Sequence, residues 1–326
     1  MNHYYKMWTD ATEDRNGFIP IEANWRQVPG RDEKWAADQR SVLGEQKYLQ
    51  EMECEFMGSA GTLISAMALK ALAFVKPEFE NDDGLKIYQS PIQHHSYVIT
   101  VDTSRGKGLD YSAFTVINVT EFPYRVVATF RSNEISPLTY PAVLKRVGTH
   151  YNNAYILVEI NDNGQQVADN LFEDYEYENL VSTVEIKKRM TATWQYGKGS
   201  DRGIRTTKSV KRLGCSIMKD LIEGQKLHIQ DYDTIAELST FIAKGTSYEA
   251  DDGSHDDMVM CLVLFAWLSN QQFFMDISKN NIKDKLYKQK MEQIEEESLP
   301  MPISSDMHPD NGDYYVEGGT LWQIVR

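Results

Sequence analysis

Three acidic positions of this chain lie at the ends of apolar segments, where a carboxylate can meet both water and a ligand. Asp102 ends one β-branched run, Glu159 ends a second, and Asp256 and Asp257 precede a strongly apolar segment. Magnesium prefers oxygen ligands and keeps several waters, so one or two carboxylates per ion suffice. Two such ions, about 3.5–4 Å apart, can activate a water and stabilise the leaving oxygen of a phosphodiester. The three positions together predict a site for hard divalent cations.

Each acid also has a structural interpretation that the sequence leaves open. An Asp at a strand end is a common turn former, which applies to Asp102. Glu159 is alternatively half of an ion pair, because Glu is rarely buried without a partner. Asp256 or Asp257 is alternatively a helix cap, since Asp is a preferred N-cap and complements the helix dipole. The occurrence of acids at the ends of three separate elements favours the metal site.

The sequence offers no obvious covalent nucleophile. It contains no Gly-x-Ser-x-Gly elbow, and none of Cys54, Cys215 and Cys261 has an evident histidine partner. Cysteines this widely spaced suit a reducing cytosol and form neither a disulfide framework nor a zinc knuckle. The 326-residue chain has no run of 18 apolar residues and no signal-peptide core, so we expect no membrane association.

Charge is distributed unevenly along the chain. The formal net charge is −14, which by itself argues against a nucleic-acid partner. Residues 187–212, however, contain nine basic residues and a single acid. Phosphate contacts depend on local potential, so an acidic protein can still hold DNA on a basic surface. We predict a DNA track, with a solvated loop as the alternative, that consists of Lys187, Lys188, Arg189, Lys198, Arg202, Arg205, Lys208, Lys211 and Arg212.

Hydrophobic periodicity predicts an α/β domain over residues 93–275. Three consecutive strands followed by alternating helices and strands indicate a mixed sheet with helices on both faces. The predicted strands are 96–102, 113–119, 124–131, 154–160, 180–184 and 226–229. The predicted helices are 137–150, 164–173, 207–223, 234–244 and 257–268.

Composition divides the rest of the chain into three further parts. Residues 1–75 are mixed and moderately acidic, and residues 76–92 contain the Pro and Gly of a linker. Residues 276–326 are predicted to be a charged helix, at about 281–297, followed by a tail. Within the first part, the predicted elements are a helix at 33–50, a strand at 51–56 and a helix at 62–74.

The acidic segments resemble the nuclease domain of the large terminase subunit of tailed bacteriophages, in the contractile-tailed, myovirus-type branch. Residues 101–114, Val-Asp-Thr-Ser-Arg-Gly-Lys-Gly-Leu-Asp-Tyr-Ser-Ala-Phe, follow the first acidic motif of that family. Residues 158–161 correspond to the second motif and residues 255–259 to the third. The resemblance covers essentially the whole chain and implies a ribonuclease-H-like fold. It also implies a metal-dependent endonuclease that cleaves double-stranded DNA concatemers during viral genome packaging.

The resemblance further implies roles for individual residues. Asp110 matches an additional acid of the family motif and is expected behind the ligands, and His255 is expected to orient water or phosphate. A structural role for His255 beside the helix start is the alternative. Two Mg²⁺ ions, for which Mn²⁺ can substitute, are expected, with Asp102 as the bridge between them. The implied catalytic metal ligands are Asp102, Glu159 and one of the pair Asp256 and Asp257.

The N-terminal part resembles the closing portion of the packaging ATPase domain of the same family, in residues 2–8 and 53–59. We therefore interpret residues 1–75 as a remnant of a partial α/β ATPase subdomain. The chain contains no Gly-x-x-x-x-Gly-Lys-Ser/Thr loop, so we expect no ATP hydrolysis by this chain alone. The implied partners are double-stranded DNA, a portal protein, a small terminase subunit and a separate polypeptide with the nucleotide site. The implied location is the cytoplasm of an infected bacterial host.

Two other functions remain open at this point. One is a different ribonuclease-H-like nuclease, such as a resolvase or a ribonuclease H proper, although the ATPase-like N-terminal part argues against it. The other is a non-catalytic module that docks on DNA or on a portal protein. The complete set of acids argues against a loss of catalysis.

Overall fold

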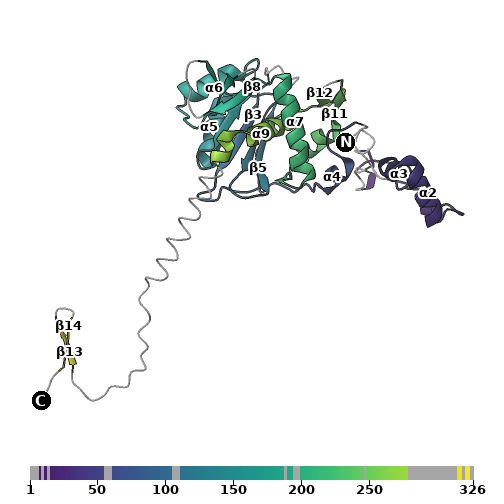
Figure 1. Ribbon diagram of the computed structural model, residues 1–326, viewed down its shortest axis with the longest axis horizontal. Helices are drawn as coiled ribbons and strands as arrows, with labels where there is room; N and C mark the ends of the chain where they lie inside the picture. The colour runs from purple at the N-terminus through teal and green to yellow at the C-terminus, as the bar shows by residue number, and fades with distance from the viewer. Residues whose placement is uncertain are drawn as a thin grey trace. The chain divides into compact units, whose positions relative to one another are not determined.

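A mixed β-sheet lies at the centre of residues 79–277 (Figure 1). Its strand order is β1-β2-β5-β4-β3-β6, with β10 beside β5. Strands β3, β4 and β5 are antiparallel neighbours, whereas β6 is parallel to β3 and β10 is parallel to β5. This arrangement confirms the predicted mixed sheet. The strands are β1 (Phe79–Glu80), β2 (Leu85–Ile87), β3 (Tyr97–Asp102), β4 (Ser112–Asn118), β5 (Tyr124–Ser132), β6 (Tyr155–Val158) and β10 (Leu227–His228).

This computed structural model describes residues 7–8, 11–12, 15–54, 61–104, 111–186, 189–193, 199–245, 247–277, 314–317 and 320–323. The chain divides into two compact units, residues 1–281 and residues 282–326. In the second unit, β13 (Tyr314–Glu317) and β14 (Thr320–Gln323) form an antiparallel hairpin. The charged helix predicted at 281–297 lies outside the described residues. No helix in the described part of the chain is both long and apolar enough to cross a membrane.

Helices cover both faces of the sheet, as the periodicity predicts (Figure 1). On one face, α5 (Tyr140–His150) and α6 (Gly164–Glu173) pack on a buried cluster that contains Ile99 and Val101 of β3. On the other face, α7 (Lys208–Glu223), α8 (Tyr232–Thr240) and α9 (Asp257–Ser269) pack on a cluster that contains Val98. Successive residues of a strand point to opposite faces, so β3 contributes to both cores. The nearly uniform apolar character of α9 is explained by its burial from Met258 to Leu268.

Two smaller sheets complete this region. The first has the strand order β8-β7-β9 and the second pairs β11 with β12. Residues Ile204 and Leu180 also form parallel bridges to Glu159 and Ile156, and so extend the central sheet beyond β6. The strands of these smaller sheets are β7 (Ser182–Ile186), β8 (Arg189–Thr193), β9 (Ser200–Arg202), β11 (Phe241–Lys244) and β12 (Ser247–Ala250).

Several predicted elements differ from the structure. The helix predicted at 234–244 ends at Thr240, because the buried Phe241 opens strand β11 instead. Residues 85–87, predicted within a linker, form β2 and pair with β5. The helix predicted at 62–74 is reduced to α4 (Ala66–Ala71). The strand predicted at 51–56 is wrong at its start, since the preceding helix continues to Glu51.

The structure also shows how residues 61–75 contact the sheet domain. The Leu63 N–H donates to the Phe241 carbonyl at 3.0 Å, and the Val75 N–H donates to the Gln230 carbonyl at 3.0 Å. Leu63 and Ile64 are buried in the same cluster as α9. These residues therefore share the core of the sheet domain. The predicted domain boundaries, with residues 1–75 as an ATPase remnant, stay predictions.

A small helical module occupies residues 15–54. Its helices are η1 (Trp25–Gln27), α2 (Glu33–Leu43) and α3 (Glu45–Glu51), with Gly44 at a positive φ of 76° between the last two. We had predicted one continuous helix at 33–50. Glycine adopts this conformation at no steric cost and commonly ends a helix, so the helix is interrupted there. Trp25, Ala36 and Tyr48 form the buried centre of the module.

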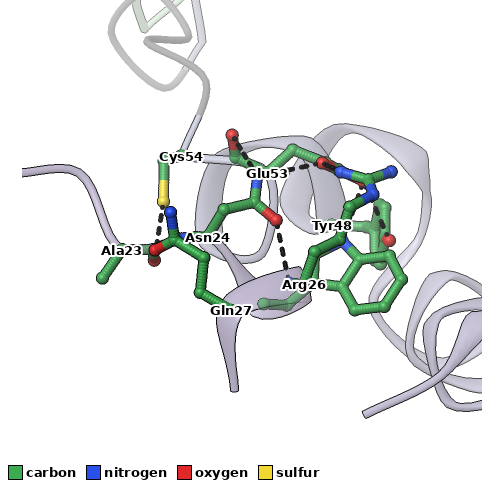
Figure 2. A network of polar contacts seen from close by, with 8 residues as sticks. Ala23, Asn24, Arg26, Gln27, Tyr48, Glu53 and Cys54 are labelled. Atoms are coloured by element: carbon green, nitrogen blue, oxygen red, sulfur yellow. Dashed lines mark hydrogen bonds and ion pairs between the residues drawn. The ribbon is translucent and has the colours of Figure 1, made fainter. Parts of the chain in front are cut away.

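The Glu53 carboxylate links several residues of this module through hydrogen bonds (Figure 2). Glu53 accepts hydrogen bonds from Trp25 Nε1 at 2.9 Å, Tyr48 Oη at 3.1 Å and Asn24 Nδ2 at 3.2 Å, and it pairs with the Arg26 guanidinium. Burial acts to raise the pKa of Glu53, but the donors from Arg26, Trp25, Asn24 and Tyr48 outweigh it and lower the pKa to about 2. Hydrogen bonds to the ionised form produce such a shift.

We expect Glu53→Gln to weaken amide protection across residues 15–54 at pH 7, because the amide cannot reproduce the ion pair with Arg26. The contribution of a carboxylate with a lowered pKa is complete above its unfolded pKa of about 4.5 and is lost as the pH falls through about 2. Hydrogen exchange of wild type and variant, compared at pH 7, 4.5 and 2.5, should therefore show a difference that shrinks on acidification. The exposed Glu51→Gln is the control, and a difference independent of pH would contradict the proposed role of the Glu53 charge.

Candidate metal centre

Asp102 and Glu159 are brought together by the register of two parallel strands. Val101 of β3 pairs with Val158 of β6, and the Glu159 N–H donates to the Val101 carbonyl at 2.9 Å. The next residue on each strand is therefore one of the two acids. Side-chain alternation places both acids on the sheet face that is covered by α9. Two acids 57 positions apart in sequence thus become neighbours.

The environment of Asp102 disfavours its charge. Part of the residue remains accessible at the strand end, yet burial raises the pKa of Asp102 well above its usual value. The neighbouring Glu159 raises the pKa further, through its charge and through a hydrogen bond between the two side chains. Two adjacent carboxylates cannot both ionise cheaply, so they share a proton or bind a cation. This pair therefore fits a hard divalent cation, which would take the place of the shared proton.

Glu159 is held from several directions and is itself buried. Asn161 Nδ2 donates to Glu159 Oε1 at 3.0 Å, which turns one carboxylate oxygen toward the loop. Thr103 Oγ1 donates to the Glu159 carbonyl at 3.3 Å. A Cβ on Gly164, the first residue of α6, would overlap that same carbonyl oxygen. The sequence analysis missed the roles of Thr103 and Asn161, although both lie within two residues of a predicted ligand.

We expect Gly164→Ala to displace the backbone of Glu159 and to reduce both stability and any activity of the site. Overpacking of this kind costs typically about 1–3 kcal/mol. Thermal denaturation measures the first effect and a cleavage assay measures the second. Gly17→Ala is the matched control, because a Cβ on Gly17 meets nothing within 4 Å. A Gly164→Ala variant with wild-type stability would show that the α6 start can move without cost.

Asp256 and Asp257 stand at the start of α9 in different surroundings. Asp256 is the N-cap residue, but its side chain makes no capping hydrogen bond. Its Oδ2 lies 3.8 Å from Lys211 Nζ. Asp257 Oδ2 lies 3.9 Å from Arg131 Nη2 and 3.8 Å from His255 Nδ1. The structure thus does not support the alternative that the Asp256 side chain caps the helix.

The two acids also act differently on Asp102. Among the charges that raise the pKa of Asp102, Asp257 contributes more than Asp256. The side chain of Asp257 is 13% exposed and that of Asp256 is 29% exposed. Asp257 is therefore the more buried acid of this pair.

Glu237 of α8, which the sequence analysis did not single out, also reaches the start of α9. Its Oε2 accepts the N–H of Met258 at 2.8 Å and the N–H of Val259 at 3.1 Å. Its Oε1 lies 3.4 Å from Arg131 Nη2. Burial raises the pKa of Glu237 to about 8, although Arg131 and the two N–H groups act to lower it. Its position gave no distinct signal in the sequence, because the buried residues of α8 also include Thr234, Ser239 and Thr240.

Aromatic and basic side chains lie next to Asp257. The Arg131 guanidinium lies 3.9 Å from the centroid of the Tyr111 ring. The ring of His255 contacts Tyr111 edge-on at 5.0 Å. Arg131 and Tyr111 also line a cavity of about 550 Å³ that extends between β2 and α5. Asp110, predicted behind the ligands, lies outside the described residues.

The acids form an open arrangement. Within the described residues, no three His, Cys, Asp or Glu side chains are grouped as the ligands of one ion. Asp102 and Glu159 are in contact, while Asp257 is turned toward Arg131. The structure thus brings two of the predicted ligands together and places the third at the edge of the same site.

The predicted basic residues separate into distinct groups. Arg202 pairs with Glu173 at 2.7 Å and Asp169 at 3.4 Å, so it anchors β9 to α6. Lys211 lies beside Asp256, and Lys208 is exposed at the start of α7. Lys187, Lys188 and Lys198 lie outside the described residues. The three that line one cavity, of about 760 Å³, are Arg189, Arg205 and Arg212.

The comparisons with known proteins agree with this fold. The family described as "Terminase RNaseH-like domain" matches residues 99–266, a range that includes Asp102, Glu159 and the start of α9. The large terminase nuclease from thermophilic phage G20c with bound cobalt is similar at 21% identity and a TM-score of 0.50, over 66% of this chain and 100% of that one. Its form with bound magnesium is similar at 20% identity and a TM-score of 0.49, with the same coverage.

These findings confirm the predicted ribonuclease-H-like mixed sheet with helices on both faces. They leave the myovirus-type branch as a prediction. The match spans more than half of the chain and contains each of the acidic segments that the sequence analysis singled out. The chain belongs to the terminase RNaseH-like domain family.

Proposed function

We propose that this chain is a metal-dependent endonuclease that cleaves double-stranded DNA concatemers during viral genome packaging. One observation carries the proposal: Asp102 and Glu159 are in-register neighbours whose side chains share a hydrogen bond in a desolvated site. Such a pair is unfavourable without a proton or a cation between its members. The relatives from phage G20c bind magnesium and cobalt, which supports a divalent cation here.

The ligands that we propose are Asp102, Glu159 and Asp257. One or two Mg²⁺ ions held there would supply an activated water and neutralise charge on the leaving oxygen. The protein contributes the positions of the oxygens: Asn161 fixes one oxygen of Glu159, and the β3–β6 register fixes Asp102 beside it. Helices cover both faces of the sheet and exclude bulk water from the protein side of the site. The lower local dielectric strengthens each electrostatic interaction within the site.

The proposal is tested by incubating the purified chain with supercoiled plasmid in Mg²⁺ or Mn²⁺, with and without excess chelator. We expect cleavage only with the free metal and little dependence on sequence. A four-way junction and an RNA–DNA hybrid, tested in parallel, distinguish the two alternative nucleases. Cleavage of either one in preference to plasmid would replace our proposal, and binding of DNA without any cleavage would favour a docking module.

We propose that DNA is held in part by the Arg189–Arg205–Arg212 cavity. These three guanidiniums come from β8, from the segment before α7 and from α7 itself. The cavity also contains the hydroxyl groups of Thr191, Thr207 and Ser209, and Glu185 is its acidic member. Arginine forks and hydroxyl groups are the usual donors to phosphate oxygens.

We expect the triple variant Arg189→Ala, Arg205→Ala, Arg212→Ala to bind DNA more weakly and with a flatter dependence on salt. The slope of log K against log salt should change by up to about 0.9 for each phosphate contact that is lost. Fluorescence anisotropy at several salt concentrations measures the slope. The control removes three exposed charges elsewhere, with Lys70→Ala, Lys76→Ala and Arg125→Ala. An equal slope change in both variants would mean that net charge, and not this cavity, holds the DNA.

Further partners are proposed from the family alone. A portal protein and a small terminase subunit would present the DNA, and a separate polypeptide would supply the nucleotide site of the ATPase. The host cytoplasm would be the place of action. Reconstitution of ATP hydrolysis from this chain and a candidate polypeptide would test the last partner, with each protein assayed alone as the reference.

A further inference from the structure

The start of a buried helix must satisfy its first N–H groups, and an acid at that position normally does so. Here two acids, Asp256 and Asp257, occupy the first positions of α9. If either side chain turned back to cap the helix, its oxygens would be committed to backbone N–H groups. A capping acid would then be a poor ligand for a metal ion.

The cap is supplied instead by Glu237, from a different helix. Glu237 Oε2 accepts the N–H groups of Met258 and Val259, at 2.8 and 3.1 Å. The Asp256 side chain makes no capping hydrogen bond. The residue Glu237 is only 5% exposed, so its carboxyl group is placed by the packing of α8 against α9.

The other oxygen of the same carboxyl is also placed. Glu237 Oε1 faces Arg131 Nη2 at 3.4 Å, and the Arg131 guanidinium lies against the Tyr111 ring. The same Nη2 atom is 3.9 Å from Asp257 Oδ2. Glu237 therefore accepts N–H groups of the first turn of α9 through one oxygen and contacts Arg131, which also faces Asp257, through the other.

We propose that Glu237 is a positioning residue: it caps α9 in place of Asp256 and contacts Arg131, which also faces Asp257, and so sets the position from which Asp257 is presented to a divalent cation. This inference rests on the proposed metal-dependent function. It adds a residue from α8 that acts through the start of α9 and through Arg131 on the orientation of a ligand.

Two variants separate the cap from the carboxyl group. Glu237→Gln keeps an oxygen at the same reach for the two N–H groups but places an amide next to Arg131. Glu237→Asp keeps the carboxyl group but shortens the side chain by one methylene, so that it no longer reaches both N–H groups. If the cap is what matters, the aspartate variant is the impaired one.

The first measurement is Mn²⁺ binding to the full chain without DNA, by titration calorimetry. We expect Glu237→Asp to weaken binding about 10- to 100-fold, the usual range for groups that orient a metal ligand. Glu237→Gln should stay within about threefold of wild type under the same standard. The Mg²⁺ concentration for half-maximal cleavage should rise in the same order, with the maximal rate largely recovered at saturating metal. Glu249→Asp, at an exposed position of β12, is the control.

The second measurement does not depend on metal. Amide exchange at Met258 and Val259 should be faster in Glu237→Asp than in wild type or Glu237→Gln. The reverse order of the two variants, or equal exchange and equal Mn²⁺ affinity in all three proteins, would overturn the inference. If wild type bound no Mn²⁺ and cut no DNA, the proposed function would fail. The exchange rates would then still decide whether Glu237 caps the helix.

Discussion

Asp102→Asn is expected to lower metal-dependent DNA cleavage by at least about 10²–10³-fold, the loss typical when one electrostatic contact to a developing charge is removed. The substitution hardly changes volume, but it removes the ligand charge beside Glu159. Because burial and Glu159 already disfavour the Asp102 charge, a neutral amide at this position should not destabilise the metal-free protein. Cleavage of plasmid and thermal denaturation, measured on the same preparation, separate the two effects.

The matched control for this experiment is Asp220→Asn, on the exposed surface of α7. It removes the same charge from the chain and should leave cleavage and its metal dependence unchanged. Full activity of Asp102→Asn would exclude Asp102 as a ligand and would return it to the role of a turn former. Unfolding of Asp102→Asn would instead show that the carboxyl group is needed for stability.

Asp257→Asn and Asp256→Asn are expected to differ strongly, although the two residues are adjacent. Asp257 acts more strongly on Asp102 and is less exposed, so its loss should lower cleavage by about 100-fold or more. Asp256 pairs with Lys211 at 3.8 Å, and a partly exposed pair of this kind is worth only about 0–1 kcal/mol. We therefore expect less than about a tenfold effect for Asp256→Asn under the same standard.

Mn²⁺ affinity and cleavage, measured across a range of Mg²⁺ concentrations, distinguish a lost ligand from a lost structural contact. A lost ligand weakens metal binding itself, whereas the loss of the Lys211 pair should change only the thermal midpoint. Lys211→Gln serves as the control for Asp256→Asn, because it breaks the same pair from the other side. Equal losses in both Asp variants, or a larger loss in Asp256→Asn, would reassign the third ligand to Asp256.

The sequence predicted most of the central elements, because their patterns are local. The apolar runs in 96–102 and 113–119 correspond to β3 and β4, and the helix predicted at 164–173 is α6 with the same bounds. The predicted secondary structure was wrong where tertiary contacts outweighed the local preference of the segment for a helix or a loop. Residues 241–244 continue a helical pattern, yet the buried Phe241 starts a strand that pairs with β12. Residues 85–87 lie within the predicted linker 76–92, although their pairing with β5 makes them β2.

The basic residues of segment 187–212 show the same limit of sequence-based prediction for a candidate DNA-binding site. Nine basic residues within a short stretch predict a positive surface, and three of them do line one cavity. Arg202 and Lys211 instead face acids from other elements, Glu173 and Asp256. Which basic residue meets solvent and which meets a carboxylate depends on neighbours distant in sequence. A count of charges along the chain contains no such information.

By itself, the sequence determined the types of chemistry that are available: acids at the ends of apolar segments, the absence of an obvious covalent nucleophile, and the family resemblance that those segments carry. Only the tertiary structure decided how the acids meet. The parallel register of β3 and β6 makes Asp102 and Glu159 neighbours, and the packing of α8 on α9 brings Glu237 to the helix start. Arg131, near the C-terminal end of β5, contacts Asp257. These contacts join residues that are tens of positions apart, and their geometry follows from sheet register and helix packing, which no local pattern encodes.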